Sequence, residues 1–280
     1  MDLLAQTKYL LKKTGLKPDK LRGQNFCIDK NIIDEMIKTA QVSKEDHVLE
    51  VGPGFGFLTL ELIKQAKEVV AVELDEKLIK PLKQLEKANQ NLEVIQGNIL
   101  DFNLITKNFL DYKIVANLPY SITSVFLKKF LTIPQKPKSM TLLVQKEVAE
   151  RICAKAGEMS KLSVSVQLYG LPKMITDVKP SSFWPEPAVN STILQINDIH
   201  SYQFANQVSE KFFWRVVKSG FSAKRKQLHN NLKNSLHLKE KEIDKIFSLT
   251  GLDIKIRAQE LEIADWVKLS KTYEEVHIDA

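Results

Sequence analysis

The stretch His47-Val-Leu-Glu-Val-Gly-Pro-Gly-Phe-Gly56 decides the fold of this chain. It begins with a short apolar run, which predicts a strand over 47–51. Three glycines follow at alternate positions, and the segment 57–65 then has the apolar spacing of a helix. A strand, a glycine turn and a helix in this order are typical of the first unit of an α/β sheet, where the turn allows a ligand to approach the backbone closely.

The same alternation continues outward along the chain. Further strands are expected at 69–73, 92–95, 112–116 and 140–144, and further helices at 31–41, 77–87, 124–131 and 146–154. This alternation predicts a parallel, doubly wound sheet, in which ligands lie beyond the carboxyl ends of the strands. The residues that follow the first four strands should therefore gather along one edge: Gly52–Gly56, Glu73, Asn98 and Asn117.

The pattern changes near residue 200. Two more strands, 173–178 and 191–196, flank the proline-rich loop 180–187. Only helices are expected after that, at 205–219, 224–235, 239–249 and 263–273. The sequence thus predicts a Rossmann-like α/β domain over 1–200, which includes a basic N-terminal arm, and a small all-helical domain over 201–280.

The net charge of +7 is unevenly distributed. Residues 1–30 carry 7 Lys and Arg against 3 Asp and Glu, and residues 201–257 carry 12 against 5, whereas 31–200 balance at 20 each. Two basic regions around a neutral middle are typical of proteins that bind the phosphates of nucleic acids. A solvated lysine-rich surface has the same composition and is the alternative.

Other compositional features argue against several protein classes. The hydrophobic content of 44% is ordinary for a globular protein. No apolar run approaches the roughly 20 residues of a membrane span, and the N-terminus lacks a signal-peptide pattern. Cys27 and Cys153 lie far apart and outside any metal-ligand spacing. We therefore expect a cytoplasmic protein without membrane spans, disulfides or a bound metal.

The residues around the first two strands indicate the kind of cofactor. Glu50 stands two residues before the first glycine, and no Lys-Ser/Thr pair follows the turn, which argues against a pyrophosphate or P-loop site. Glu73 ends the second strand, where a carboxylate can accept both hydroxyls of a ribose. A charge at a helix N-terminus is the alternative role for Glu73.

The stretch Asn117-Leu-Pro-Tyr120 follows the fourth strand. It combines a side-chain amide, a proline without an N–H, and a flat aromatic face, which together suit a planar exocyclic amine. A simple Asn-x-Pro turn is the alternative. With the glycine turn and Glu73, the stretch predicts an S-adenosylmethionine-dependent methyltransferase. An NAD-type dehydrogenase would normally carry G-x-G-x-x-G and gives this stretch no role.

These motifs, taken together, resemble a known family. Asn117–Tyr120 has the Asn-Leu-Pro-Tyr form found in the small-subunit ribosomal RNA adenine N6,N6-dimethyltransferases (KsgA type). Further segments resembling that family, in order along the chain, are Gly23–Phe26, Phe183–Ser191 and Phe221–Leu232, with a less close match at Arg257–Leu261. The resemblance covers almost the whole chain, and it implies a class I S-adenosylmethionine methyltransferase domain followed by a small helical domain.

The resemblance also implies an activity and a set of site residues. The expected reaction is dimethylation of the N6-amino groups of adjacent adenines near the 3′ end of small-subunit ribosomal RNA, within a pre-small ribosomal subunit. The residues expected at the reacting base are Asn117, Leu118, Pro119, Tyr120 and Phe183. The residues expected at the cofactor are Gln24, Asn25, Cys27, Gly52, Gly54, Glu73, Leu74, Asn98, Ile99 and Asn117. Tyr120 and Phe183 would stack on the base, although a core-capping role is the alternative for Phe183.

The RNA phosphates are expected to meet a single basic docking face, which predicts a monomer. Its residues are Arg22, Arg215, Lys218, Lys224, Arg225 and Lys226. The chain also departs from the family at three positions: Asn98 and Asn190 stand where Asp is usual, and Cys27 replaces Leu. A neutral acceptor at Asn98 should bind the cofactor adenine more weakly than a carboxylate, so Asn98→Asp should tighten cofactor binding.

Two other functions remain open from the sequence. One is the related antibiotic-resistance type of methyltransferase, which modifies an adenine of large-subunit RNA. The other is a relative without catalysis that acts as a ribosome assembly factor or a transcription factor.

Overall fold

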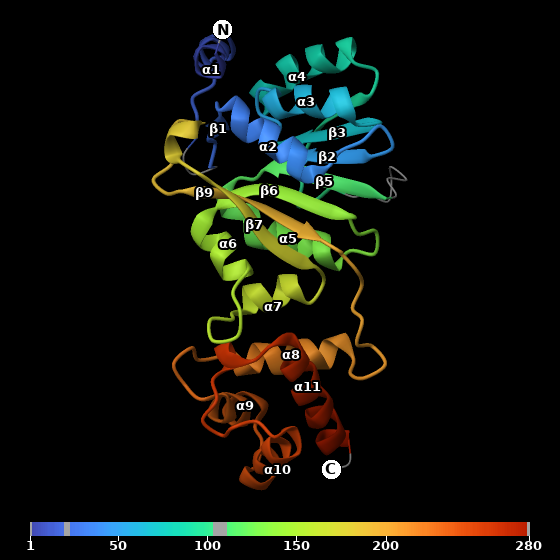
Figure 1. The fold of residues 1–280 in the computed structure, drawn as a ribbon, viewed down its shortest axis with the longest axis vertical. Helices are drawn as coiled ribbons and strands as arrows, with labels where there is room; N and C mark the ends of the chain where they lie inside the picture. Colours follow the sequence, from blue (N-terminus) through green and yellow to red (C-terminus); the bar gives the residue numbers. More distant parts are fainter. Residues whose placement is uncertain (1, 20–22, 103–110, 279–280) are drawn as a thin grey trace. The chain divides into compact units, whose positions relative to one another are not determined.

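The computed structural model describes residues 2–19, 23–102 and 111–278 (Figure 1). The chain divides into two compact units. The first comprises Met1–Glu150 and Gly170–Ile199, and the second comprises Arg151–Tyr169 and His200–Ala280. One change of unit therefore falls at the predicted boundary near residue 200. Residues 151–169, which the sequence assigned to the first domain, group with the second unit instead.

The sheet of the first unit has seven strands in the described residues, in the order β4-β3-β2-β5-β6-β9-β7. Their bounds are β2 (His47–Val51), β3 (Glu68–Glu73), β4 (Leu92–Gln96), β5 (Tyr112–Asn117), β6 (Ser139–Gln145), β7 (Leu171–Val178) and β9 (Ser191–Asn197). Strands β2 to β6 pair in parallel, as predicted. Strand β9 pairs antiparallel with both β6 and β7, so the sheet is mixed at that edge.

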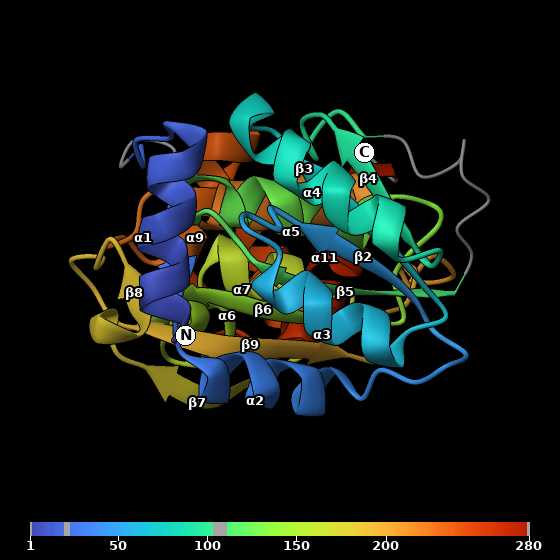
Figure 2. The ribbon, with the colours of Figure 1, turned by 90° about the horizontal axis from the view of Figure 1, so that it is seen from above.

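Helices cover both faces of this sheet. Helices α2 (Lys30–Ala40), α3 (Phe57–Gln65) and α4 (Glu76–Ala88) lie on one face, and α5 (Thr123–Thr132) lies on the other (Figures 1 and 2). The central strands are buried along almost their whole length, which explains why they read as continuous apolar runs. The turns at the carboxyl ends of β2, β3 and β5 are thereby held by a packed core. Helix α6 (Lys146–Ile152) follows β6.

The N-terminal arm is more structured than predicted. Helix α1 (Leu3–Thr14) is capped by Asp2, and Leu3 and Leu11 pack against the core cluster of the first unit. The basic residues of this segment concealed its apolar spacing. A two-residue strand, β1 (Phe26–Cys27), pairs antiparallel with β8 (Phe183–Trp184), so the N-terminal segment lies beside the proline-rich loop. Short 3-10 turns occur at Tyr120–Ile122, Pro180–Ser182 and Ala258–Glu260.

The second unit is helical in the described residues. Its helices are α7 (Lys161–Gln167), which was not predicted, α8 (Glu210–Gly220), α9 (Leu228–Leu236), α10 (Glu240–Thr250) and α11 (Ile263–Ile278). The helix expected over 224–235 begins only at Leu228. The preceding residues form a turn, because the buried Asn231 Nδ2 donates to the carbonyls of Gly220 (2.6 Å) and Ala223 (3.0 Å). Within the described part of the chain, none of the helices has the length and apolar content that crossing a membrane would require.

Candidate functional site

The glycine turn after β2 is tied to the end of β3. Gly52 and Gly54 have φ angles of +64° and +59°, a region that side chains disfavour. A Cβ at Gly54 would lie 3.1 Å from Cδ1 of the Phe26 ring, so the turn and β1 are in close contact. The Gly54 N–H donates to Glu73 Oε2 over 3.1 Å. The turn therefore contacts the carboxylate that the sequence predicts to bind a ribose.

Two buried carboxylates stand at this end of the sheet. Each oxygen of Glu73 accepts one backbone N–H, from Gly54 and from Asp75 (2.8 Å), which leaves acceptor capacity on both oxygens. Burial raises the pKa of Glu73. Glu50 is 1% exposed, and its Oε2 has no hydrogen-bond partner among the described residues. Burial, with a contribution from the charge of Glu73, raises the pKa of Glu50 to about 8.

The Asn117–Tyr120 stretch leaves the carboxyl end of β5. Asn117 Nδ2 donates to the backbone carbonyl of Asn25 over 3.0 Å. The Leu118 N–H donates to the carbonyl of Leu143 on β6 over 3.2 Å, which keeps the stretch against the sheet. The hydroxyl of Tyr120 is 2.6 Å from Ser191 Oγ, so the ring is anchored at its far end. The amide and the aromatic ring are therefore both held in place.

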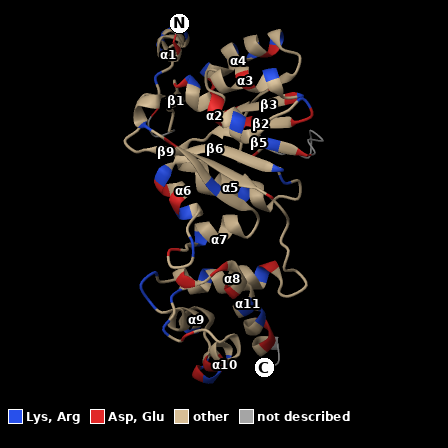
Figure 3. Cartoon of the chain, in the orientation of Figure 1, with Lys and Arg blue, Asp and Glu red and all other residues tan. Residues whose placement is uncertain are grey.

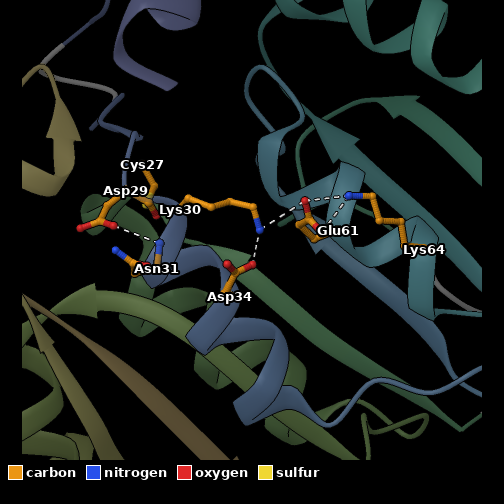
Figure 4. Close-up of polar contacts among 7 residues, drawn as sticks. All are labelled: Cys27, Asp29, Lys30, Asn31, Asp34, Glu61 and Lys64. Carbon is orange, nitrogen blue, oxygen red and sulfur yellow. Dashed lines mark hydrogen bonds and ion pairs between the residues drawn. The ribbon is translucent and has the colours of Figure 1, made fainter. Parts of the chain in front are cut away.

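The chain enters helix α2 directly after β1, and a set of polar contacts fixes this entry (Figure 4). Asp29 caps α2 by accepting the Asn31 N–H over 3.0 Å, and its other oxygen accepts from Ser182 Oγ over 3.0 Å. Lys30 pairs with Asp34 on α2 and reaches Glu61 on α3, 3.4 Å away. These contacts place β1 and its neighbour Asn25 relative to the glycine turn.

Cys27 lies in β1, where the family has Leu. Burial raises the pKa of its thiol to about 11, so the side chain is neutral at physiological pH. It packs as a small side chain against the core cluster, and its Sγ donates to the Asp29 carbonyl over 3.7 Å.

A cavity lies against these elements. Seven of the ten predicted cofactor residues line it: Gln24, Asn25, Cys27, Gly52, Gly54, Glu73 and Asn117. The lining also includes Glu50 and the rings of Phe26, Phe55 and Phe57, to which the sequence gave no site role. The position of Glu50 at the end of a strand could have indicated a site role. Nothing in the sequence marks the three aromatic residues as site residues, because their spacing is equally typical of a core face.

The remaining three predicted cofactor residues do not belong to the lining in the described part of the chain. Leu74 is 58% exposed, and Ile99 is buried at 4% exposure. Asn98 is exposed, and its amide is engaged locally: Nδ2 donates to Asp101 Oδ2 (2.8 Å), and Oδ1 accepts the Leu100 N–H (3.0 Å). The turn after β4 is therefore closed on itself rather than directed toward the cavity.

Phe183 occupies a different environment from the predicted one. It is 1% exposed and belongs to the same buried cluster as Phe26 and Ile193. A ring with no open face cannot stack on a base, so the structure favours the core-capping alternative. Its pairing with Cys27 in the β1–β8 ladder is what holds it there.

The residues of the second unit that were predicted to bind phosphates are exposed. Arg215 and Lys218 lie on α8, and Lys224, Arg225 and Lys226 lie in the turn between α8 and α9, rather than on a helix (Figure 3). The Arg215 guanidinium is 5.8 Å from the ring centroid of Tyr273. Arg22 lies outside the described residues.

The described residues hold one group with the composition of a metal site, His229, Glu240 and Asp244. Glu240 is already paired with Lys233, and His229 Nε2 lies 3.3 Å from Asp244 Oδ1. These pairings account for the group as a contact between α9 and α10.

The sequence model of the family described as "Ribosomal RNA adenine dimethylase" matches residues 17–275, nearly the whole chain. The chain belongs to this family. A relative from Dehalococcoides mccartyi, named "Ribosomal RNA small subunit methyltransferase A", is 40% identical over 97% of this chain and 94% of its own length.

Two solved structures support the fold. A dimethyladenosine transferase from Plasmodium falciparum has a TM-score of 0.74 and 27% identity, covering 90% of this chain and 98% of its own. The 23S rRNA methyltransferase ErmE has a TM-score of 0.72 at 23% identity, covering 89% and 100% respectively. The predicted fold class, a Rossmann-like methyltransferase domain with a helical C-terminal region, is confirmed, as are the enzyme class and its dependence on S-adenosylmethionine.

The cavity residues of this ribosomal RNA adenine dimethylase fit that cofactor. Gly54 leaves room where a side chain would meet Phe26, so the turn admits a ligand close to its backbone. Glu73 retains acceptor capacity for ribose hydroxyls, and Glu50 Oε2 is a buried acceptor without a partner in the described residues. Donors on the ribose and on the amino-acid end of the cofactor match these acceptors.

Proposed function

We propose that this ribosomal RNA adenine dimethylase modifies the small-subunit RNA, adding two methyl groups to the N6-amino groups of adjacent adenines near its 3′ end during small-subunit assembly. The observation that carries the proposal is the Asn117 amide, held beside the cofactor cavity by the Asn25 carbonyl. The preference for small-subunit RNA is supported by the 40% identical relative whose name specifies that subunit. ErmE, named for large-subunit RNA, is similar in fold alone.

The chemistry needs a better nucleophile than free adenine offers. When bound, S-adenosylmethionine would supply an electrophilic methyl group on its sulfonium. The adenine N6 would attack that methyl carbon, so that the C–N bond forms as the C–S bond breaks. S-adenosylhomocysteine would leave with the electron pair of the C–S bond, and the nitrogen would then lose a proton to solvent. The N6 lone pair is delocalised into the ring. Asn117 Oδ1 and the Leu118 carbonyl would accept the two N–H groups, favouring a pyramidal nitrogen with a localised lone pair. Positioning and electrostatics then account for the rate, without a strong base.

Tyr120 supports the base-binding role. Its ring is half-buried, and its hydroxyl is anchored on Ser191, so one face can stack on an extruded base at low entropic cost. Such a stack is worth about 1–3 kcal/mol. Pro119, which precedes Tyr120, lines the cavity and has no N–H that could compete for a hydrogen bond.

The basic turn between α8 and α9 is proposed to bind RNA phosphates. Lys224, Arg225 and Lys226 are consecutive and exposed, and Lys218 and Arg215 precede them on α8. Contacts of this kind position the RNA without reading its sequence. A monomeric state and a cytoplasmic location stay predictions; light scattering on the purified protein tests the first, and cell fractionation tests the second.

One assay separates this proposal from its alternatives. The protein is incubated with methyl-labelled S-adenosylmethionine and with unmethylated small or large ribosomal subunits. We expect label in N6,N6-dimethyladenine of the small-subunit RNA. Label in large-subunit RNA alone would favour the antibiotic-resistance type, and absence of label at saturating cofactor would favour a non-catalytic assembly factor.

A further inference from the structure

The segment Gly23–Asn25 lies directly on the Asn117–Tyr120 stretch. Gly23 has a φ of +66°, and a Cβ there would lie 3.3 Å from the Tyr120 nitrogen. The Asn25 carbonyl accepts from Asn117 Nδ2. Because a carbonyl can only accept, the NH2 end of the Asn117 amide must face Asn25. The other end, Oδ1, is then the end that remains to accept an N–H of the target.

The Gln24 side chain holds this segment in place. Its Nε2 donates to Asp75 Oδ2 over 2.8 Å, and its Oε1 accepts the Asp19 N–H over 2.9 Å. Its own N–H donates to the Asp19 carbonyl over 3.1 Å. Gln24 is therefore bound on one side to the arm and on the other to the turn after β3.

Asp75 connects this contact to the cofactor site. Its Oδ1 caps α4 by accepting the Lys77 N–H over 3.0 Å, and its backbone N–H donates to Glu73 Oε1. A continuous set of contacts thus runs from Glu73 through Asp75 and Gln24 to the Asn25 carbonyl, and from there to the Asn117 amide. The carboxylate assigned to the ribose and the amide assigned to the target adenine are joined through one glutamine.

We propose that Gln24 is a positioning residue for methyl transfer: held by Asp75, it places the Asn25 carbonyl that sets the orientation of the Asn117 amide. This role rests on the proposed function of Asn117. It differs from the cofactor-contact role that the family resemblance gave Gln24, because the amide is engaged by the protein at both ends.

A donor–acceptor swap tests the contact. Gln24→Glu places a carboxylate against the Asp75 carboxylate, and Asp75→Asn places an NH2 group against the Gln24 NH2. The double variant restores the hydrogen bond with its direction reversed, since the new amide at position 75 donates to the new carboxylate at position 24. That carboxylate can still accept the Asp19 N–H. Asparagine remains a good helix cap, so the start of α4 is preserved.

Asp2→Asn, at the cap of α1, is the matched control for an Asp-to-Asn change at a helix N-terminus. The readouts are the single-turnover rate of methyl transfer at saturating cofactor and RNA, the affinity for S-adenosylhomocysteine, and the melting temperature. We expect each single variant to lower the rate about 10-fold or more while changing the affinity less, in line with the sensitivity of catalysis to small misplacements. The double variant should recover to within about 3-fold of the wild type, and Asp2→Asn should transfer at the wild-type rate.

Three results would overturn the role of Gln24. Single variants that keep the wild-type rate would do so, as would a double variant no faster than the slower single. A loss of affinity equal to the loss of rate would identify Gln24 as a cofactor contact instead. The proposed function fails differently, because in that case the wild-type protein itself transfers no methyl group to small-subunit RNA.

Discussion

The two halves of the predicted cofactor site differ in how they are held. The glycine-turn half (Gly52, Gly54, Glu73 and Asn117) is bound through backbone groups to a packed sheet, and all four residues line the cavity. The β4 half (Asn98 and Ile99) lies in a turn where Ile99 is buried and the exposed Asn98 bonds only to other groups of that turn. Preorganised hydrogen-bonding groups are worth most where the structure cannot relax around them. We therefore expect substitutions in the first half to have large effects and those in the second to have small ones.

The largest effect should come from Asn117→Ala. Loss of an oriented acceptor at the reacting nitrogen should lower the rate of methyl transfer about 100- to 1,000-fold, as removal of one transition-state hydrogen bond does elsewhere. RNA binding should hold, because the basic turn proposed to bind the RNA phosphates lies in the second unit. A filter-binding assay beside the transfer assay measures both. Near-normal turnover of this variant would remove the central premise of the mechanism.

Glu50→Gln should change stability in a pH-dependent way. The pKa of Glu50 is raised to about 8 in the folded protein, so between about pH 4.5 and 8 the folded state retains a proton that the unfolded state releases. Raising the pH through this window therefore destabilises the ligand-free wild type, by on the order of a few kcal/mol. The stability of Glu50→Gln should not fall in this way. Urea unfolding of both proteins at pH 5.5 and 8.5 measures their free energies of unfolding.

Glu45→Gln, at an exposed glutamate, is the matched control. Because it keeps Glu50, its free energy of unfolding should fall with pH as that of the wild type does. An equal difference in the free energy of unfolding between wild type and Glu50→Gln at both pH values would mean that Glu50 is already ionised at pH 5.5 in the folded protein.

Gly54→Ala should weaken cofactor binding by about 10-fold, because the added methyl meets the Phe26 ring in a backbone conformation that side chains disfavour. Gly15→Ala is the matched control: Gly15 has a similar φ of +62°, but nothing lies within 4 Å of its Cβ position. Both variants should lose about 1 kcal/mol of stability from the left-handed backbone. Titration with S-adenosylhomocysteine separates them, and equal affinities would contradict the close approach proposed for the turn.

The smallest effect should come from the β4 half. Asn98→Asp alone sets a carboxylate against Asp101, whose oxygen lies 2.8 Å from the present amide nitrogen. Asn98→Asp with Asp101→Asn keeps that hydrogen bond and still supplies a charged acceptor at 98. We expect the double variant to bind the cofactor about 2- to 5-fold more tightly than the wild type, and the single variant to gain less. Identical affinities for all three proteins would show that residue 98 does not meet the cofactor.

The same contrast explains what the sequence could and could not predict. The apolar run before Gly52 and the acid at Glu73 mark the ends of two strands. Because the carboxyl ends of parallel strands lie along one edge of the sheet, the positions of the glycine-turn half could be predicted from the sequence. The rule gives no side-chain direction within a turn, and the Asn98–Asp101 pair decides that direction locally. The burial of Phe183 could not be predicted for another reason: it depends on pairing between β1 and β8, which are far apart in the sequence.

The second unit shows a similar limit. Lys224–Lys226 have the composition of a helix, but Asn231 bonds back to the carbonyls before them, and a tertiary contact outweighs a weak local preference. Helices α8, α10 and α11 were predictable because their apolar faces repeat over several turns.

The β1–β8 ladder also bears on how the protein is made. The glycine turn, Glu73 and Asn117 all precede residue 120, but the strand that holds Phe26 and Cys27 against the pocket pairs with Phe183 and Trp184. During synthesis, most of the cofactor residues therefore leave the ribosome well before β8, the strand that pairs with β1. Forming a contact between segments so distant in the sequence is slow. A ribosome-modifying enzyme built in this way completes its own binding pocket only late in its synthesis.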